Sequence, residues 1–127
     1  MSEKVKVLIV EDEAIVAQNL CMELQLEGYH VCGFVATGEE AISLVKQEDP
    51  DLILMDVNLI GDMDGIETSE KIMELKKIPI IFMTGYSKLE FSDRAMKLNP
   101  VGYFNKPIDV EMITPLIDEI FNCSQIQ

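Results

Sequence analysis

Several reactive side chains in this sequence stand directly after apolar runs. Asp56 is the clearest case, because it follows the apolar residues Leu52–Met55 in the stretch LILMDVNLIGDMDG. Such a run suits a strand that is buried on both faces of a parallel sheet. An unpaired carboxylate buried at the end of that strand would cost several kcal/mol or would take up a proton. Asp56 is therefore expected where the chain leaves the core and enters a charged pocket.

Four other side chains hold the same kind of position, just past an apolar run: Glu11, Asp12, Thr84 and Lys106. Because the carboxyl ends of parallel strands meet at one edge of a sheet, we expect all of these groups to lie close together. Crowded carboxylates repel one another, and at least one pKa rises unless a cation lies between them. Hard oxygen ligands favour Mg²⁺ or Mn²⁺ over zinc.

A lysine and a hydroxyl beside a cluster of metal-binding carboxylates suit a phosphoryl group. Lys106 would add a fixed positive charge, and Thr84 would donate a hydrogen bond to a phosphoryl oxygen. Asp56 could then be the covalent nucleophile, which gives an aspartyl phosphate. Taken singly, these residues have simpler interpretations: an acidic helix start, a turn aspartate, a turn or strand hydroxyl and a surface lysine. We favour the joint interpretation, because the simpler ones require a coincidence at each strand end.

Apolar runs alternate along the chain with segments of helical spacing. The runs cover residues 5–10, 31–35, 52–55, 78–83 and 101–104. Strands that alternate with single helices predict right-handed βαβ units and a parallel sheet covered on both faces. We therefore expect one α/β domain over residues 1–127, with a (βα)5 doubly wound, five-stranded parallel sheet.

The first three helices are predicted from apolar spacing and capping residues. Val16, Leu20 and Leu24 repeat every four residues, and Gly28 is expected to end the first helix. Pairs of residues with the spacing of a capping box open the second and third helices: Thr37 with Glu40, and Asp64 with Glu67.

The last two helices have weaker signals. The fourth is expected over residues 87–98, before Asn99 and Pro100. The fifth should begin after Asp109, and Pro115 should remove a backbone hydrogen bond and bend or delay it.

Composition excludes several classes of protein. The formal net charge is −13, and no basic cluster offers contacts to the phosphates of nucleic acid or of anionic lipid. The apolar runs are far shorter than the roughly 20 residues of a membrane span. Charged residues near the start argue against a signal peptide, so we expect a cytoplasmic protein. The three cysteines have no paired spacing, and His30 alone makes no metal site.

The motifs at the strand ends resemble the CheY-like receiver domain of two-component response regulators. They are LIVEDE, LILMDVNL, MDGIE, PIIFMTG and GYFNKP. The resemblance runs from Val5 to about Phe121. It implies a flavodoxin-like sheet with strand order 2-1-3-4-5. Two features depart from the family pattern. Ile60 stands where a proline usually follows the phospho-acceptor by four residues, in a stretch, IGDMDG, that is one residue longer than usual. The path from Gly65 to Thr84 is short for the family, so the third helix or its exit should be trimmed.

The resemblance also implies a metal site. Asp56 would be the phospho-acceptor and a ligand of Mg²⁺ (or Mn²⁺), and Asp12 would bind the ion directly. Glu11 would act at the metal through water, and Asn58 would offer its backbone carbonyl.

The remaining roles concern the phosphoryl group and the switch. Similarity to the family implies that Thr84 and Lys106 hold phosphoryl oxygens, and that Tyr103 is an aromatic switch residue. A cis peptide bond is implied before Pro107. The surface that changes would be formed by the predicted helix 87–98, the strand 101–104 and the last helix.

Residues and resemblance together predict a phosphorylation switch rather than an enzyme that acts on other molecules. A histidine kinase or phosphotransfer protein would supply the phosphoryl group, and the changing surface would bind a partner or form a homodimer. Nucleic acid and membranes are not expected as direct partners. The output could be partner binding, phosphoryl relay or control of a longer chain.

Three alternatives remain open on the sequence. An Mg²⁺-dependent phosphohydrolase usually needs an acid two residues after its nucleophile, and Asn58 stands there. A flavin-binding domain needs a phosphate loop after the first strand, where this chain has the acidic EDEAIVAQ. A degenerate receiver that acts only as a scaffold would not need every reactive position to be filled.

Overall fold

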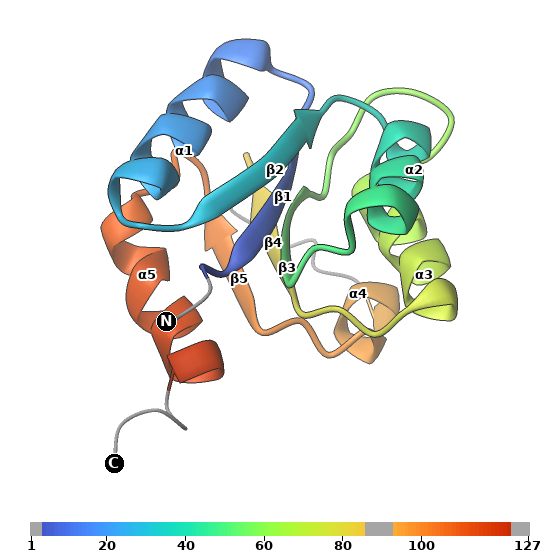
Figure 1. The fold of residues 1–127 in the computed structure, drawn as a ribbon. Coiled ribbons are helices and arrows are strands. Elements are labelled where there is room, and N and C mark those ends of the chain that lie inside the picture. The colour runs from blue at the N-terminus through green and yellow to red at the C-terminus, as the bar shows by residue number, and fades with distance from the viewer. Residues whose placement is uncertain (1–3, 86–92, 123–127) are drawn as a thin grey trace.

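The structure is a computed structural model, and it describes residues 4–85 and 93–122. Strands and helices alternate along the chain, and the strands form one parallel sheet (Figure 1). The strands are β1 (Lys6–Val10), β2 (His30–Val35), β3 (Leu52–Asp56), β4 (Ile80–Thr84) and β5 (Gly102–Asn105). Their order in the sheet is β2-β1-β3-β4-β5. The predicted fold class and strand order are therefore confirmed.

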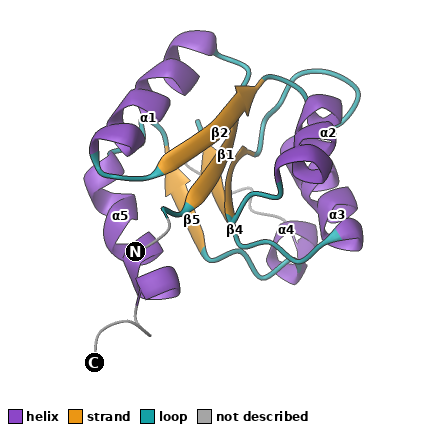
Figure 2. Cartoon of the chain, in the orientation of Figure 1, coloured by secondary structure: helices purple, strands orange, loops and turns teal. Residues whose placement is uncertain are grey.

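Helices cover both faces of the sheet (Figures 1 and 2). They are α1 (Ala14–Leu26), α2 (Gly38–Glu48), α3 (Gly65–Leu75), α4 (Asp93–Lys97) and α5 (Val110–Asn122). α1 and α5 pack on one face, and α2, α3 and α4 pack on the other. Within the predicted fourth helix, residues 87–92 lie outside the described residues.

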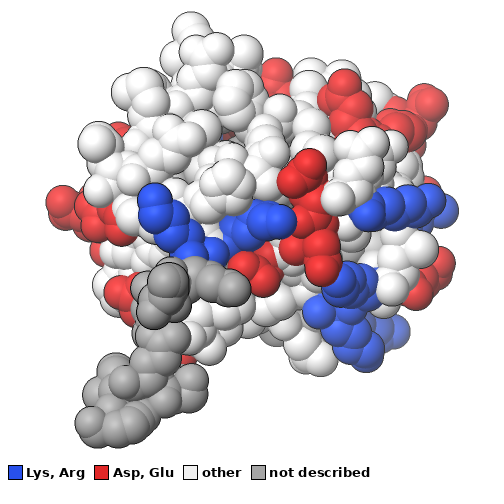
Figure 3. Space-filling view, in the orientation of Figure 1, with Lys and Arg blue, Asp and Glu red and all other residues white. Residues whose placement is uncertain are grey.

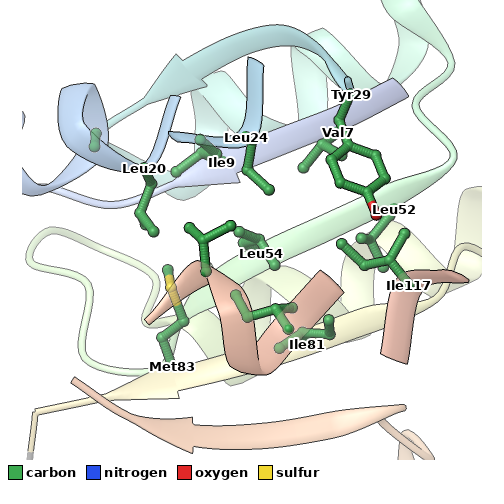
Figure 4. Packing of buried hydrophobic residues seen from close by; sticks show 13 residues of the cluster. Val7, Ile9, Leu20, Leu24, Tyr29, Leu52, Leu54, Ile81, Met83 and Ile117 are labelled. Atoms are coloured by element: carbon green, nitrogen blue, oxygen red, sulfur yellow. The ribbon is translucent and has the colours of Figure 1, made fainter. Parts of the chain in front are cut away.

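Each face of the sheet has its own core. Figure 4 shows the core under α1 and α5, where Leu20 and Leu24 lie near Ile9 and Leu54 of the central strands and Ile117 lies beside Leu52. All five residues of both β3 and β4 are buried. This burial explains why apolar runs, rather than alternating patterns, mark these two strands.

The strands that carry reactive side chains end later than their apolar runs. β3 continues through Asp56, which pairs with Met83, and β4 continues through Thr84, which pairs with Asn105. The backbones of Asp56 and Thr84 take part in the sheet, and their side chains form hydrogen bonds at its carboxyl edge. Both are therefore held by the sheet and not by a loop.

The predicted helix caps are present. Thr37 Oγ1 accepts a hydrogen bond from the Glu40 N–H at 3.2 Å, and Asp64 Oδ1 accepts one from the Glu67 N–H at 2.8 Å. The Glu40 carboxylate reaches back to the Ala36 N–H at 3.1 Å. The sequence signals therefore fixed the starts of α2 and α3.

α5 begins directly after Asp109 and continues through Pro115, so the predicted delay of this helix is wrong. The Glu111 N–H is bound by Asp109 Oδ1 at 3.0 Å, which supports the first turn. Pro115 lies on the exposed side of the helix, as does Glu111, whose carbonyl loses the hydrogen bond. Water can bind that carbonyl, so the helix tolerates the proline there.

The negative charge is unevenly distributed on the surface. Figure 3 shows acidic side chains at several places on one face, whereas the surface over α1 is largely uncharged. Among the described residues, no helix has the length and apolar character needed to cross a membrane.

Neighbouring positions on α5 test the assignment of the core. Ile113 is fully buried and Met112 is 61% exposed. We expect Ile113→Ala to lower the free energy of unfolding by about 2–5 kcal/mol, because it leaves a cavity. Met112→Ala should change it by less than about 0.5 kcal/mol. Urea denaturation of both variants measures the difference, and equal losses would contradict the packing of α5.

Candidate functional site

The structure brings the predicted reactive residues together at the carboxyl edge of the sheet. Glu11 and Asp12 follow β1, Asp56 and Thr84 end β3 and β4, and Lys106 follows β5. The Lys106 N–H donates to the Thr84 carbonyl at 2.7 Å, which joins the last two of these strand ends. An open pocket of about 810 Å³ lies over this edge, and Asp12, Asp56 and Lys106 are among its lining residues.

Three carboxylates in this pocket are close enough to share one cation. Glu11, Asp12 and Asp56 each offer one oxygen, and these oxygens lie within 4.8 Å of one another. Glu11 and Asp56 are only 2% exposed, whereas Asp12 is partly exposed at the pocket. An all-oxygen set of this kind fits Mg²⁺ or Mn²⁺, with water completing the coordination.

Lys106 supplies the positive charge that the buried acids need. Its Nζ donates to Glu11 Oε1 at 2.8 Å and to Asp56 Oδ2 at 3.2 Å. Burial, together with the neighbouring Asp56 charge, holds the pKa of Glu11 above its usual value despite the hydrogen bond from Lys106. Burial would lower the pKa of Lys106, but its bond to Glu11 and the charge of Asp56 outweigh this and raise it. The lysine therefore stays a cation at neutral pH.

Both oxygens of the Asp56 carboxylate are held in place. Oδ2 accepts from Lys106, and Oδ1 accepts from the backbone N–H of Asn58 at 2.9 Å. A charge-assisted hydrogen bond on each side fixes the plane of the carboxylate. This orientation presents an anionic oxygen to the pocket, as a nucleophile requires.

The loop between β3 and α3 packs directly against Asp56. The Val57 N–H donates to the Met83 carbonyl at 2.8 Å, and the Gly65 N–H donates to the Val57 carbonyl at 3.0 Å. A Cβ atom on Gly65 would collide with the Asp56 carbonyl oxygen. Only glycine allows α3 to begin this close to Asp56, which explains the glycine in the MDGIE motif.

Ile60 gives the loop a contact that a proline could not make. Its backbone N–H donates to Asp12 Oδ2 at 3.3 Å. Proline has no N–H, so this hydrogen bond depends on the departure from the family pattern noted above. The contact ties the loop to the acid that is most exposed in the cluster.

Thr84 is buried, with 4% of its surface exposed, and its hydroxyl donates to Asn58 Oδ1 at 3.2 Å. Sequence reasoning gave Asn58 a role only through its backbone carbonyl and missed this side-chain contact. The position of Asn58 could have indicated the contact, because it follows Asp56 by two residues and so lies near the end of the neighbouring strand β4.

Tyr103 lies outside this pocket, on the neighbouring strand β5. It pairs with Phe82 in the sheet and packs, half-buried, against the core on the side of α2 and α3. The Lys106–Pro107 peptide bond is cis, as the resemblance implied.

Comparison with known proteins agrees with this geometry. The family of the response regulator receiver domain matches residues 7–118. Together with the parallel sheet and the acidic pocket, this match places the chain in its class: it belongs to the receiver-domain family of response regulators.

Among curated proteins, this chain is 34% identical over 113 residues to the transcriptional regulatory protein PdtaR of Mycobacterium tuberculosis, and it covers 55% of that protein. It is also 34% identical over 109 residues to sporulation initiation phosphotransferase F of Bacillus subtilis, with 85% of this chain and 86% of that protein aligned. The chain thus spans about half the length of PdtaR and most of the phosphotransferase.

Solved structures give the same result. The receiver domain of a modulated diguanylate cyclase from Desulfovibrio desulfuricans is 36% identical with a TM-score of 0.85, and 92% of this chain and 93% of that one align. A CheY-like receiver domain from Methanospirillum hungatei is 30% identical with a TM-score of 0.83, at 93% and 94% coverage.

The carboxylate cluster predicts that Mg²⁺ stabilises the fold by binding the native state. At a concentration ten times the Kd, the gain is about 1.4 kcal/mol, enough to raise the melting temperature by several degrees. Asp12→Ala should remove most of this gain, since it deletes a ligand oxygen. The adjacent, exposed Glu13 serves as the control, and Glu13→Ala should retain the gain. Thermal melts with and without Mg²⁺ measure it, and an unchanged shift in Asp12→Ala would place the ion elsewhere.

Proposed function

We propose that this chain is a phosphorylation-controlled signalling switch that accepts a phosphoryl group on Asp56. The observation that carries the proposal is the buried Asp56 carboxylate, oriented by Lys106 and by the Asn58 N–H and open to a pocket lined by Asp12. The carboxylates, the lysine and the threonine hydroxyl that phosphoryl transfer to Asp56 would use lie together at the carboxyl edge of the sheet. A phosphohydrolase usually needs an acid two residues after its nucleophile, and this chain has Asn58 there. A receiver that acted only as a scaffold would not need these reactive residues.

In the proposed reaction, an oxygen of Asp56 attacks the phosphorus of a phosphohistidine on a partner protein. The P–N bond breaks as the P–O bond forms, and the released imidazole takes up a proton. Lys106 and Thr84 lie beside Asp56 and would hold phosphoryl oxygens as negative charge moves onto them. Attack by water on phosphorus later restores the carboxylate and releases inorganic phosphate.

A divalent ion fits the same pocket. Glu11, Asp12 and Asp56 would hold Mg²⁺, with the Asn58 carbonyl as a further ligand, and the ion would neutralise charge between the carboxylates and the phosphoryl group. Lys106 already bridges Glu11 and Asp56, so the chain contributes one fixed cation of its own.

Partners follow from this chemistry. The phosphoryl donor would be a histidine kinase or a phosphotransfer protein, as is usual for receiver domains. The name of one relative, sporulation initiation phosphotransferase F, supports a role in phosphoryl transfer. We propose that the chain acts on no other substrate and promotes only its own phosphorylation and dephosphorylation. The net charge of −13 argues against direct binding of this domain to nucleic acid.

The surface that signals would be the one formed by α4, β5 and α5. Met96 on α4 and Met112 on α5 are 55% and 61% exposed, and flexible apolar side chains of this kind are common at binding surfaces. A second pocket of about 350 Å³, lined by Tyr103, Phe104 and Met112 among others, lies between β5 and α5. We propose that a partner or a second copy of the chain binds here.

Labelling with acetyl phosphate tests the acceptor. The intact mass should rise by one phosphoryl group only when Mg²⁺ is present, because an anionic donor cannot approach the acids without a cation. Asp56→Asn should abolish the adduct. Asp62→Asn, which changes an exposed aspartate of the same loop, should label like the parent. Labelling of Asp56→Asn at the parent level would refute the assignment.

The phosphoryl mimic beryllofluoride tests the switch. If the Thr84 hydroxyl moves toward the new oxygens, Tyr103 can turn into the vacated space and change the α4-β5-α5 surface. We expect amide chemical shifts to change at Tyr103 and along α4 and α5, as well as around Asp56. In Thr84→Val the changes at Tyr103 should be lost. Shifts confined to the Asp56 pocket of the parent would refute the switch and leave the phosphorylation chemistry standing.

A further inference from the structure

The Thr84 hydroxyl already has an acceptor in the structure, and that acceptor is not part of the proposed transfer. It donates to Asn58 Oδ1 at 3.2 Å, across 26 residues of sequence and between two neighbouring strand ends. The backbone of Asn58 has separate tasks, since its N–H binds Asp56 Oδ1 and its carbonyl is a proposed ligand of the metal. The side-chain carboxamide is left without a role in the transfer itself.

The position of this carboxamide is fixed by the backbone on both sides. The Val57 N–H continues the β3–β4 ladder by donating to the Met83 carbonyl at 2.8 Å. The Asn58 N–H is bound to Asp56 Oδ1 at 2.9 Å. Since Asp56 pairs with Met83, these two bonds bring Asn58 to the end of β4, where Thr84 lies. The contact therefore rests on ordered backbone and not on a freely moving loop.

A threonine hydroxyl has a single proton to donate. It can donate to Asn58 Oδ1 or to a phosphoryl oxygen on Asp56, but a full bond to one excludes a full bond to the other. The anionic acceptor forms the stronger bond, so phosphorylation would draw the hydroxyl away from the amide. The free energy of the Thr84–Asn58 hydrogen bond must then be given up before Thr84 can move, so this bond opposes the switch.

We propose that the Asn58 carboxamide is a positioning residue that holds Thr84 in its resting position and so sets how readily the phosphorylated conformation is reached. The inference rests on the proposed function, because it concerns the same switch. Loss of one neutral hydrogen bond of this kind should raise the resting population of the phosphorylated-like conformation about two- to tenfold.

Nuclear magnetic resonance of the unphosphorylated protein tests the proposal in Asn58→Ala, which keeps the backbone N–H and carbonyl. Three-bond couplings to the Thr84 methyl carbon report its rotamer. We expect one dominant rotamer in the parent and rotamer averaging in Asn58→Ala. Amide shifts of β5 should move from the free parent toward its beryllofluoride-bound form. Asn19→Ala removes the same group from an exposed position on α1 at the other side of the pocket, and should leave Thr84 unchanged.

A double-mutant cycle separates this role from a general effect on the loop. Thr84→Val removes the donor, so adding Asn58→Ala to it should produce no further movement of the β5 shifts. The proposal is overturned if Asn58→Ala leaves the Thr84 rotamer unchanged, or if it moves the β5 shifts equally in the Thr84→Val background. The rotamer measurement needs no phosphoryl donor. It therefore stands apart from the labelling of Asp56, whose failure would refute the proposed function alone.

Discussion

The site depends on keeping one carboxylate charged at the end of a fully buried strand. Asp56 is 2% exposed, and an unpaired carboxylate in that position would cost several kcal/mol or would be neutral. The ammonium of Lys106 and the N–H of Asn58 remove that cost, one on each carboxylate oxygen. Lys106 must come from the far side of β4, which a parallel sheet of order β2-β1-β3-β4-β5 provides. The topology is thus the means by which a lysine distant in sequence reaches Asp56.

The charges of the pocket remain unbalanced, and this imbalance has a use. Three carboxylates face one ammonium among the clustered groups. A divalent cation would neutralise the remaining negative charge and would also attract an incoming phosphoryl group. Burial and the neighbouring Asp56 charge already hold the pKa of Glu11 above its usual value. The crowded carboxylates therefore repel one another, and a bound cation would relieve this repulsion.

Much of this arrangement could be predicted from the sequence, because it rests on periodic patterns and on residue types at strand ends. Buried runs placed β3 and β4, and capping residues placed the starts of α2 and α3. The close contacts that the β3–α3 loop makes with the strand ends could not be predicted in this way. The approach of Gly65 to the Asp56 carbonyl and the bond from Thr84 to Asn58 depend on how one loop folds back onto two strands. Pro115 was misjudged because its effect depends on which side of α5 faces water.

The β3–α3 loop connects the parts of the site that strands alone would leave independent. Asn58 contacts Asp56 through its N–H and Thr84 through its side chain, and Ile60 contacts Asp12. The loop therefore touches the proposed nucleophile, the Thr84 hydroxyl and a proposed metal ligand, yet its own side chains have no proposed part in the phosphoryl transfer. Since both Asn58 and Ile60 are exposed, substitutions there are tolerated by the core. Under the proposed function, such a loop would adjust the rate and the lifetime of the phosphorylated state while the reactive residues stay the same.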